Sequence, residues 1–403
     1  MQVAVIGGGA AGFFSALSVK NHHPEAEVVL YEKSDKLLSK VKVSGGGRCN
    51  VTHHCFKVSD LVKFYPRGER PLRKAFGVFA PKDTIAWFAE RGVELKTEAD
   101  GRMFPVTDSS QTIIDCLWNE ARKLGVRIDV KSPIKKLIPK DTGFLLGFKN
   151  GEQKQVDKVI VATGGSPRRD GFNWLRELGH NIEEPVPSLF TFNMPNEVIR
   201  ELMGVVANPV SIRIMGTKLK SEGPVLITHW GMSGPAVLKL SAFGARLLYE
   251  MDYNCSALIN WTGDKSEQEI RGVLSAVINE HAKKKVQNVN PFELPSRLWL
   301  FLLQKLEVSD TMIWDNMGKK NINRLVHLLM NDEYKVEGKT TFKEEFVTCG
   351  GVSLQDVDIK TMQSRKAAGL YFAGEVLDID GVTGGFNFQA AWTTGFIAGK
   401  LGD

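Results

Sequence analysis

Cysteine and long apolar runs are both scarce in this chain of 403 residues. The five cysteines are few and odd in number, which argues against a disulfide framework and predicts a reducing, cytoplasmic setting. No apolar run approaches the roughly twenty residues that span a bilayer, so we expect no membrane-spanning segment. The first residues, MQVAVIGGGAAG, are typical of a strand and a glycine turn, and not of a cleavable leader.

A large excess of charge of one sign is also missing. The 52 lysines and arginines exceed the 46 acidic residues only slightly, and this dispersed net charge of +6 argues against nucleic acid as a partner. We interpret the basic run 281–285 as the end of a helix, where cations suit the helix dipole. Arg168, Arg169 and the basic segment Arg67–Arg73 are interpreted as solvated surface charge, with steering of an anionic substrate as the alternative.

Patterns for metal binding, hydrolysis and disulfide exchange are absent. His53 and His54 have no cysteine or carboxylate partners at ligand spacing, so no metal site is predicted. Ser233 lacks the glycine elbow of a serine hydrolase and is interpreted as a helix cap before Gly234-Pro235. Cys49 and Cys55 have five residues between them, whereas flavin disulfide reductases have four, so a redox dithiol is disfavoured.

Glycine is abundant instead, with 39 residues, about a tenth of the chain against roughly 7% in average usage. Gly7, Gly9 and Gly12 form G-x-G-x-x-G. The motif directly follows an apolar run, Val3–Ile6, and opens a segment of helical composition, Ala10–Lys20. In a βαβ unit Gly7 permits the tight turn, Gly9 admits a pyrophosphate, and Gly12 lets the helix pack on the strand. The sequence therefore predicts a dinucleotide-binding fold.

One further observation supports the dinucleotide site, and a second favours FAD over NAD as its occupant. Glu32 ends the next apolar run and lies 20 residues beyond Gly12, where its carboxylate can accept hydrogen bonds from ribose hydroxyls. Glycine clusters also recur far downstream, at 163–165, 374 and 384–385, and the last precedes a helix whose dipole would stabilise charge on a reduced flavin. Because G-x-G-x-x-G occurs only once after a strand, NADH or NADPH would be a transient donor.

The rest of the chain changes in texture near Pro185–Pro187. Before that point, helical periodicity at 81–95, 109–125 and 173–179 alternates with apolar runs at 126–130, 144–149 and 156–162. Short β-like runs then fill 190–261, among them 210–215, 225–228 and 257–261. Helical spacing covers 265–331, with helices expected at 267–285, 297–306 and 321–329. A β-like stretch at 340–348, a strand at 369–373 and a helix at about 388–401 follow.

Six sequence blocks, in order, resemble a known family: VAVIGGGAAG (3–12), KVSGGGRCNVTH (42–53), VATGG (161–165), the segment 170–189, THWGMSGPAVLKLS (228–241) and the segment 348–399. The chain is similar to bacterial NAD(P)/FAD-dependent oxidoreductase flavoproteins, which include dehydro-bile-acid reductases and aminoacetone-oxidase-like proteins. The resemblance implies an α/β fold, a Rossmann-like FAD-binding domain interrupted by a β-barrel-like domain and a small helical domain. The expected boundaries are 1–188 with 346–403, 189–262 with 334–345, and 263–333.

The resemblance also implies further cofactor contacts beyond Gly7, Gly9, Gly12 and Glu32. Those in the first half of the chain are Ala10, Ala11, Lys33, Lys42, Ser44, Gly45, Gly46, Arg48, Cys49, Asn50, Thr163 and Gly164. Those near the C-terminus are Gly374, Glu375, Asp380, Gly384, Gly385, Asn387 and Phe388. Cys349 would lie near the flavin ring, or serve only in packing.

Two residues are candidates for catalysis. His229 could transfer a proton beside a hydride step, or be a structural histidine, and Arg48 could stabilise reduced flavin, or form a salt bridge. The sequence thus predicts an FAD-dependent oxidoreductase acting on a small molecule, favoured as the reduction of an activated C=C bond with NAD(P)H. A flavin oxidase acting on an amine with O2, an FAD-dependent tRNA-modifying protein and a flavin module without turnover are the alternatives. Substrate, donor, direction, oligomeric state and covalent flavin attachment stay open.

Overall fold

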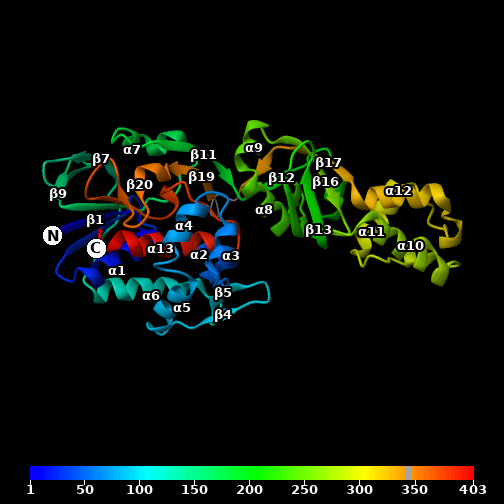
Figure 1. The fold of residues 1–403 in the computed structure, drawn as a ribbon, viewed down its shortest axis with the longest axis horizontal. Coiled ribbons are helices and arrows are strands. Elements are labelled where there is room, and N and C mark those ends of the chain that lie inside the picture. The colour runs from blue at the N-terminus through cyan, green and yellow to red at the C-terminus, as the bar shows by residue number, and fades with distance from the viewer. Residues whose placement is uncertain (342–346) are drawn as a thin grey trace. The chain divides into compact units, whose positions relative to one another are not determined.

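A computed structural model describes residues 1–341 and 347–403, which form two compact units. The first unit consists of residues 1–188 and 347–403, and the second of residues 189–341. Figure 1 shows the first unit in blue to green and in orange to red, and the second in green to yellow-orange. The predicted boundaries inside the second unit stay predictions, and the one at 345/346 lies outside the described residues, as does part of the β-like stretch expected at 340–348.

A seven-stranded sheet forms the centre of the first unit, in the order β20-β21-β22-β10-β1-β2-β6. Its members are β1 (Gln2–Ile6), β2 (Glu27–Tyr31), β6 (Arg127–Asp129), β10 (Lys158–Val161), β20 (Val357–Asp358), β21 (Gln363–Ser364) and β22 (Leu370–Phe372). Strand β1 runs parallel to both β10 and β2, and Val5 lies between Ile160 and Leu30. These central strands are buried apolar runs, as expected for parallel strands. The predicted βαβ unit is confirmed.

Helices α1 (Ala10–His22) and α13 (Phe386–Gly399) pack side by side in this unit (Figure 1). Both are buried along most of their length, which explains why neither has one polar face. Close approach requires Gly399, because a Cβ there would lie 2.4 Å from the Cβ of Ser18. The Ser18 hydroxyl donates to the Phe396 carbonyl at 2.6 Å, so α13 is fixed against the helix that follows the glycine turn.

The remaining elements of the first unit surround this centre. Its other helices are α2 (Ser39–Gly47), α3 (Val58–Leu61), α4 (Glu69–Ala75), α5 (Pro81–Ala89), α6 (Ser110–Lys123) and α7 (Asn173–Arg176). Its small antiparallel sheets are β3 (Thr52–His53), β5 (Arg102–Pro105) and β4 (Leu95–Thr97); β7 (Ile134–Pro139), β8 (Phe144–Phe148) and β9 (Gln153–Val156); and β11 (Ile182–Ser188) with β19 (Val347–Val352). Short 3-10 turns are η1 (Val62–Phe64), η2 (Arg169–Phe172), η6 (Leu354–Asp356) and η7 (Gly374–Val376).

The second unit contains a seven-stranded antiparallel sheet in the order β17-β16-β13-β14-β15-β12-β18. Its strands are β12 (Thr191–Asn193), β13 (Val206–Ile214), β14 (Lys220–Ile227), β15 (Gly231–Ser233), β16 (Asn254–Asn260), β17 (Asp332–Glu337) and β18 (Lys339–Thr340). The interpretation of Ser233 as a helix cap is wrong. Ser233 ends β15, where it pairs with Leu226, and Gly234 is the N-cap of the helix that follows.

The helices of the second unit are α8 (Pro235–Phe243), α9 (Ala245–Glu250), α10 (Glu267–His281), α11 (Ser296–Lys305) and α12 (Gly318–Met330), with 3-10 turns η3 (Val198–Leu202), η4 (Val286–Asn288) and η5 (Trp314–Asn316). Helix α10 begins at a capping box, in which the Ser266 hydroxyl and the Glu269 carboxylate bond to each other's backbone N–H. The run 281–285 does contain the end of α10, at His281, but its three lysines lie just beyond the helix. Ala282 is the C-cap, and Lys285 pairs with Ile313 beyond it.

Candidate functional site

The glycine turn after β1 leaves room at one residue and none at its neighbours. A Cβ added at Gly12 would lie 1.8 Å from the Gly7 carbonyl oxygen, so only glycine lets α1 start this close to β1. At Gly9, by contrast, an added Cβ would meet nothing within 4 Å. Gly9 is also the N-cap of α1, and no side chain caps it. The helix N-terminus therefore faces open space, which suits an anionic group.

Glu32 follows β2 and turns its carboxylate toward this loop. The Gly8 N–H donates to Oε2 at 2.9 Å, while the Ser34 N–H and hydroxyl donate to Oε1 at 2.9 and 2.8 Å. A carboxylate has about four acceptor positions, so one remains for a ribose hydroxyl. Lys33 and Lys42 point to solvent and are exposed.

The predicted glycine loop ends α2 with a break in the helix. Ser44 is extended, and Gly45 and Gly46 are left-handed, with φ of 59° and 69°. The Asn50 amide, oriented with its nitrogen toward the Thr52 carbonyl, accepts a hydrogen bond from the Gly385 N–H at 3.0 Å. A Cβ at Gly385 would lie 2.5 Å from the Thr52 oxygen, so this close approach requires glycine. The predicted contact segments that contain Asn50 and Gly385, which lie far apart in the sequence, are thus adjacent.

The middle of α13 lies beside the first turn of α1, because a Cβ at Gly395 would lie 2.9 Å from the Ala11 carbonyl oxygen. Gly374, in η7, donates from its backbone N–H to the Thr394 hydroxyl at 2.8 Å, which fixes it against α13. A Cβ at Gly374 would lie 2.7 Å from the Cβ of Ala11 in the first turn of α1. The first turn of α1, the Gly374 turn and the middle of α13 are therefore adjacent in the first unit.

Glu375 connects this region to α2 and β19. Its Oε2 pairs with the Lys40 ammonium at 2.5 Å, and its Oε1 accepts from the Thr348 N–H at 2.8 Å. A Cβ at Gly165 would clash with Thr348 and with Glu375, so the turn after β10 packs against both. Thr163 in that turn is exposed, and an added Cβ at Gly164 would meet nothing within 4 Å.

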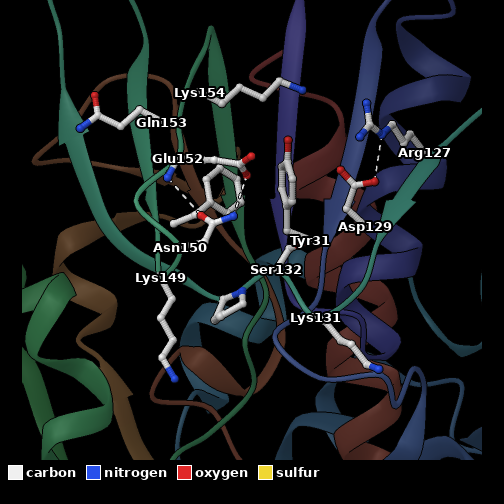
Figure 2. Close-up of a pocket in the computed structure, with 12 residues that line it drawn as sticks. Tyr31, Arg127, Asp129, Lys131, Ser132, Lys149, Asn150, Glu152, Gln153 and Lys154 are labelled. Atoms are coloured by element: carbon white, nitrogen blue, oxygen red, sulfur yellow. Dashed lines mark hydrogen bonds and ion pairs between the residues drawn. The ribbon is translucent and has the colours of Figure 1, made fainter.

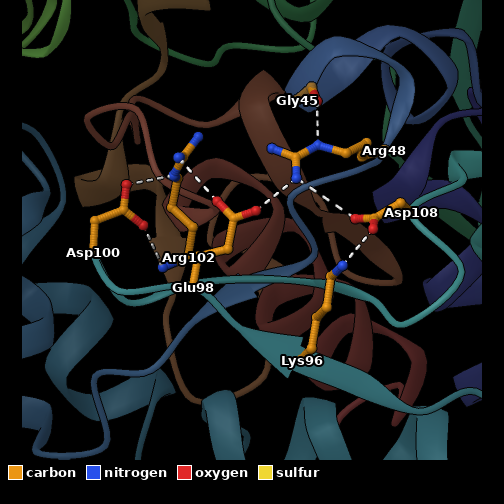
Figure 3. Close-up of polar contacts among 7 residues, drawn as sticks. All are labelled: Gly45, Arg48, Lys96, Glu98, Asp100, Arg102 and Asp108. Carbon is orange, nitrogen blue, oxygen red and sulfur yellow. Dashed lines mark hydrogen bonds and ion pairs between the residues drawn. The ribbon is translucent and has the colours of Figure 1, made fainter.

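Arg48 belongs to a network of ion pairs shown in Figure 3. Its Nη1 lies 2.6 Å from Glu98 Oε1 and 3.5 Å from Asp108 Oδ1, and its guanidinium lies 4.0 Å above the Phe104 ring. Arg102 pairs with the other oxygen of Glu98 at 3.0 Å. The hydrogen bond to Glu98 is the main cause that raises the pKa of Arg48. In this arrangement Arg48 braces the glycine loop against β4 and β5.

Cys49 and Cys55 are both free thiols. Cys49 is buried with a φ of 62°, and burial raises the pKa of its thiol to about 12. Burial also raises the pKa of Cys55. Thiols that stay protonated are poor nucleophiles, which agrees with the expectation that no redox dithiol forms here. Cys349 is buried in β19, which pairs with β11 through Val186.

Asp380 is fully buried and bonded on both oxygens. Arg67 donates to both of them, and the Ser188 hydroxyl donates to Oδ2 at 2.7 Å. The interpretation of Arg67 as solvated surface charge is wrong, because its side chain is only 13% exposed and pairs with Asp380. Asn387 closes the same loop through reciprocal hydrogen bonds of 2.9 Å to the Gly381 backbone. Phe388 stacks on Trp392 within α13, with ring centroids 5.8 Å apart.

His229 belongs to the second unit, where it follows β14. It is exposed, and its ring lies 3.9 Å from that of Trp230, centroid to centroid. Its predicted role in catalysis stays a prediction.

Sequence reasoning missed an aromatic group beside the α13 start. Phe386 stacks on Phe64 at 4.3 Å, and the His53 ring lies 4.6 Å from Phe386. Among the described residues, His53 Nδ1 has no hydrogen-bond partner, and burial lowers the pKa of the ring. The only sequence signal was proximity to the glycine loop, since these residues come from three separate segments.

A cavity of about 660 Å3 lies elsewhere in the first unit (Figure 2). It lies between β6, the end of β2 and the β8–β9 hairpin, and it is lined by Tyr31, Arg127, Asp129, Phe148 and Lys154 among others. Arg127 pairs with Asp129 at 2.9 Å, and Tyr31 packs edge-on against Phe148. None of the predicted cofactor contacts lines this cavity.

Across residues 1–341 and 347–403, no group of three or more His, Cys, Asp or Glu side chains is placed to hold a metal ion. In the same residues, no helix combines the length and the apolar character that crossing a bilayer requires.

The arrangement fits FAD. Open space at Gly9 and Gly164, a spare acceptor on Glu32, and the start of α13 beside Asn50 supply an anion site, a ribose contact and a second helix N-terminus in one unit. These features define a Rossmann-type flavoprotein. The model of the HI0933-like protein Rossmann domain matches residues 1–401, and the chain belongs to this family. It is an FAD-dependent oxidoreductase.

Two relatives match along almost the whole chain. The 3-dehydro-bile acid delta(4,6)-reductase of Clostridium scindens is 26% identical over 407 residues, which cover 99% of this chain and 98% of the relative. The ribosomal RNA dihydrouridine synthase of Escherichia coli is 29% identical over 408 residues, with 98% and 96% covered.

Solved structures show the same fold at lower identity. The 3-ketosteroid-delta4-(5alpha)-dehydrogenase of Rhodococcus jostii, in complex with 4-androstene-3,17-dione, is 13% identical with a TM-score of 0.50, covering 98% of this chain and 96% of its own. The 3-ketosteroid delta1-dehydrogenase of Sterolibacterium denitrificans is 12% identical with a TM-score of 0.51, covering 98% of each chain.

Proposed function

We propose that the protein reduces a carbon–carbon double bond conjugated to a carbonyl group, with NADH or NADPH as the donor. One observation carries the proposal. The two relatives are named for different substrates, a 3-dehydro-bile acid and ribosomal RNA, yet both names describe the same change. Delta(4,6) bonds of a 3-oxo steroid and the double bond of uracil are each conjugated to a carbonyl, and each gains two hydrogens on reduction.

The residues of the first unit supply binding and electrostatics for this reaction. When bound and reduced by NAD(P)H, the flavin would supply the hydride that adds to the electron-poor carbon of the double bond. The turn at Gly9 would hold its pyrophosphate, Glu32 its ribose, and the segments at Gly45, Gly46, Asn50 and Gly384–Phe388 its ring. The N-terminus of α13 carries no acidic residue in its first turn, so its dipole favours negative charge beside it.

A proton must also reach the carbon next to the carbonyl. His229 is our candidate for this donor, because a histidine ring nitrogen can carry a proton and give it to a substrate carbon. His229→Gln should keep the bound flavin spectrum and its reduction by NAD(P)H, but slow product formation by about a hundredfold. Equal rates of product formation in the two proteins would return His229 to a structural role.

Product analysis tests the proposed function. The holoenzyme and NAD(P)H would be incubated with a steroid 4-en-3-one, and with a matched steroid whose double bond is isolated from the carbonyl. We expect a mass gain of two hydrogens only for the conjugated compound, because only its double bond is polarised. Oxidation of an amine with uptake of O2, and no reduction of either steroid or of a uridine-containing RNA, would contradict the proposal and favour the oxidase.

A further inference from the structure

A group of cations gathers at one end of the helical extension of the second unit. Helix α10 leaves the sheet after β16, and α12 returns to it before β17, so the end of α10 and the start of α12 lie away from the sheet (Figure 1). We call this region the tip. Hydrogen bonds from the Trp314 N–H to the Lys284 carbonyl, and from the Asp315 N–H to the Ala282 carbonyl, hold its two segments together.

The tip carries six exposed cations: Lys283, Lys284, Lys285, Lys319, Lys320 and Arg324. Within the described part of the chain, none of these side chains forms an ion pair or a hydrogen bond. Three exposed carboxylates, Glu280, Asp310 and Asp315, belong to the same region, so positive charge remains in excess there. This local excess contrasts with the balanced composition of the chain as a whole.

Helix stability explains only some of these cations. Lys319 and Lys320 lie in the first turn of α12, where the helix dipole disfavours positive charge and no acidic residue compensates. Lys283, Lys284 and Lys285 directly follow the C-cap of α10, where the dipole favours cations, so only the lysines of α12 are left without a helical explanation. A local rule broken without a structural gain is most often found where a surface serves binding.

We infer that the tip is a docking surface for the phosphate backbone of RNA. Clustered lysines on one surface are the electrostatic footprint of nucleic-acid binding, since each phosphate contact releases a counterion. The inference rests on the proposed function, because an RNA substrate would carry the uracil ring as the conjugated double bond. Unpaired lysines bind phosphates in a structured RNA without reading its sequence, so the tip would supply affinity and not the choice of uridine.

The test uses fluorescence anisotropy with the FAD-loaded protein and a labelled, structured ribosomal RNA transcript. The tip variant is Lys319→Glu/Lys320→Glu, which places acids where the α12 dipole favours them and so does not weaken the helix. The matched control is Lys135→Glu/Lys136→Glu, two exposed lysines of β7 in the first unit. Adding Lys283→Glu/Lys284→Glu to the tip variant extends the series.

We expect the tip variant to bind RNA about tenfold more weakly and with a shallower dependence on salt, while the control stays within about twofold of the native protein. Equal losses in both variants, no RNA binding by the native protein, or a preference of the tip for anionic phosphatidylserine vesicles over RNA would overturn the inference. Reduction of the steroid 4-en-3-one is measured in parallel. If it persists while RNA binding is absent, only this inference fails; if the tip governs RNA binding but neither the steroid nor RNA is reduced, only the proposed function fails.

Discussion

A substitution at Gly9 gives the most direct test of the proposed pyrophosphate site. An added Cβ at Gly9 would meet nothing within 4 Å, and its φ of −93° is accessible to any residue. A variant with a larger side chain at this position should therefore fold, with the side chain filling the open space. Gly9→Val should therefore abolish FAD retention, as judged by the flavin absorbance of the purified protein. Gly272→Val, at an equally open and exposed glycine of α10, is the control and should retain FAD. A fully loaded Gly9→Val protein would contradict the assignment.

Arg48 has two possible roles that Glu98 can separate. If the Arg48–Glu98 pair braces the glycine loop, Glu98→Gln and Arg48→Met should both weaken FAD binding by roughly five- to tenfold, since each removes a charge-assisted hydrogen bond. Titration of the apoprotein with FAD measures this. A direct role for Arg48 at reduced flavin would instead shift the reduction potential in Arg48→Met alone.

Cys49 should be chemically silent in the folded protein. Because burial raises its pKa to about 12, its reactive thiolate is scarce at neutral pH. We expect iodoacetamide to modify the half-exposed Cys55 first, and modification of Cys49 to keep rising with pH well past the range of an ordinary cysteine. Peptide mass spectrometry after timed labelling distinguishes the sites. Rapid labelling of Cys49 at neutral pH would show that the glycine loop opens.

At the scale of elements, the capping box of α10 offers a prediction on pH. Hydrogen bonds from Ser266 lower the pKa of Glu269, so the folded carboxylate holds its proton less tightly than the unfolded one. This stabilisation is present above the unfolded pKa of about 4.3 and is lost as pH falls through the folded value. Ser266→Ala should cost about 1 kcal/mol of local stability at neutral pH.

Hydrogen exchange in the first turn of α10 measures this effect, corrected for the intrinsic rates. The difference between Ser266→Ala and the native protein should shrink on acidification, whereas exchange in α12, which has no such box, should not differ. A constant difference across the acid range would mean that the cap does not depend on the Glu269 charge.

Elements with strong local patterns could be predicted from the sequence, and those defined by distant contacts could not. The β1–α1–β2 unit and α13 follow from apolar runs between glycine turns. The prediction for Ser233 was wrong because a Ser-Gly-Pro stretch is also compatible with a strand that ends at the serine, which leaves the glycine as the N-cap. The prediction for Arg67 was wrong for a different reason, because its partner Asp380 is more than 300 residues away and leaves no local pattern.

At the scale of the whole molecule, the insertion of residues 189–341 into the first unit was visible as a change of texture. The adjacency of Asn50 with Gly385, and of Ala11 with Gly374, was not visible, because each pair joins segments that are far apart in the chain and carry no common local pattern. The resemblance to a family could place these segments at one cofactor, while the residues alone indicated only the phosphate turn and Glu32. The contacts of Lys40 and Thr348 with Glu375 had no signal in the sequence.

An anaerobic visible spectrum of the purified protein, titrated with NADH and NADPH and then with a steroid 4-en-3-one, tests the central claim most directly. The account predicts that one nucleotide bleaches the flavin band and that the enone restores it without oxygen, because electrons then pass from donor to conjugated double bond through this chain. A flavin band that an amine bleaches, that neither nucleotide changes and that the enone never restores would contradict it.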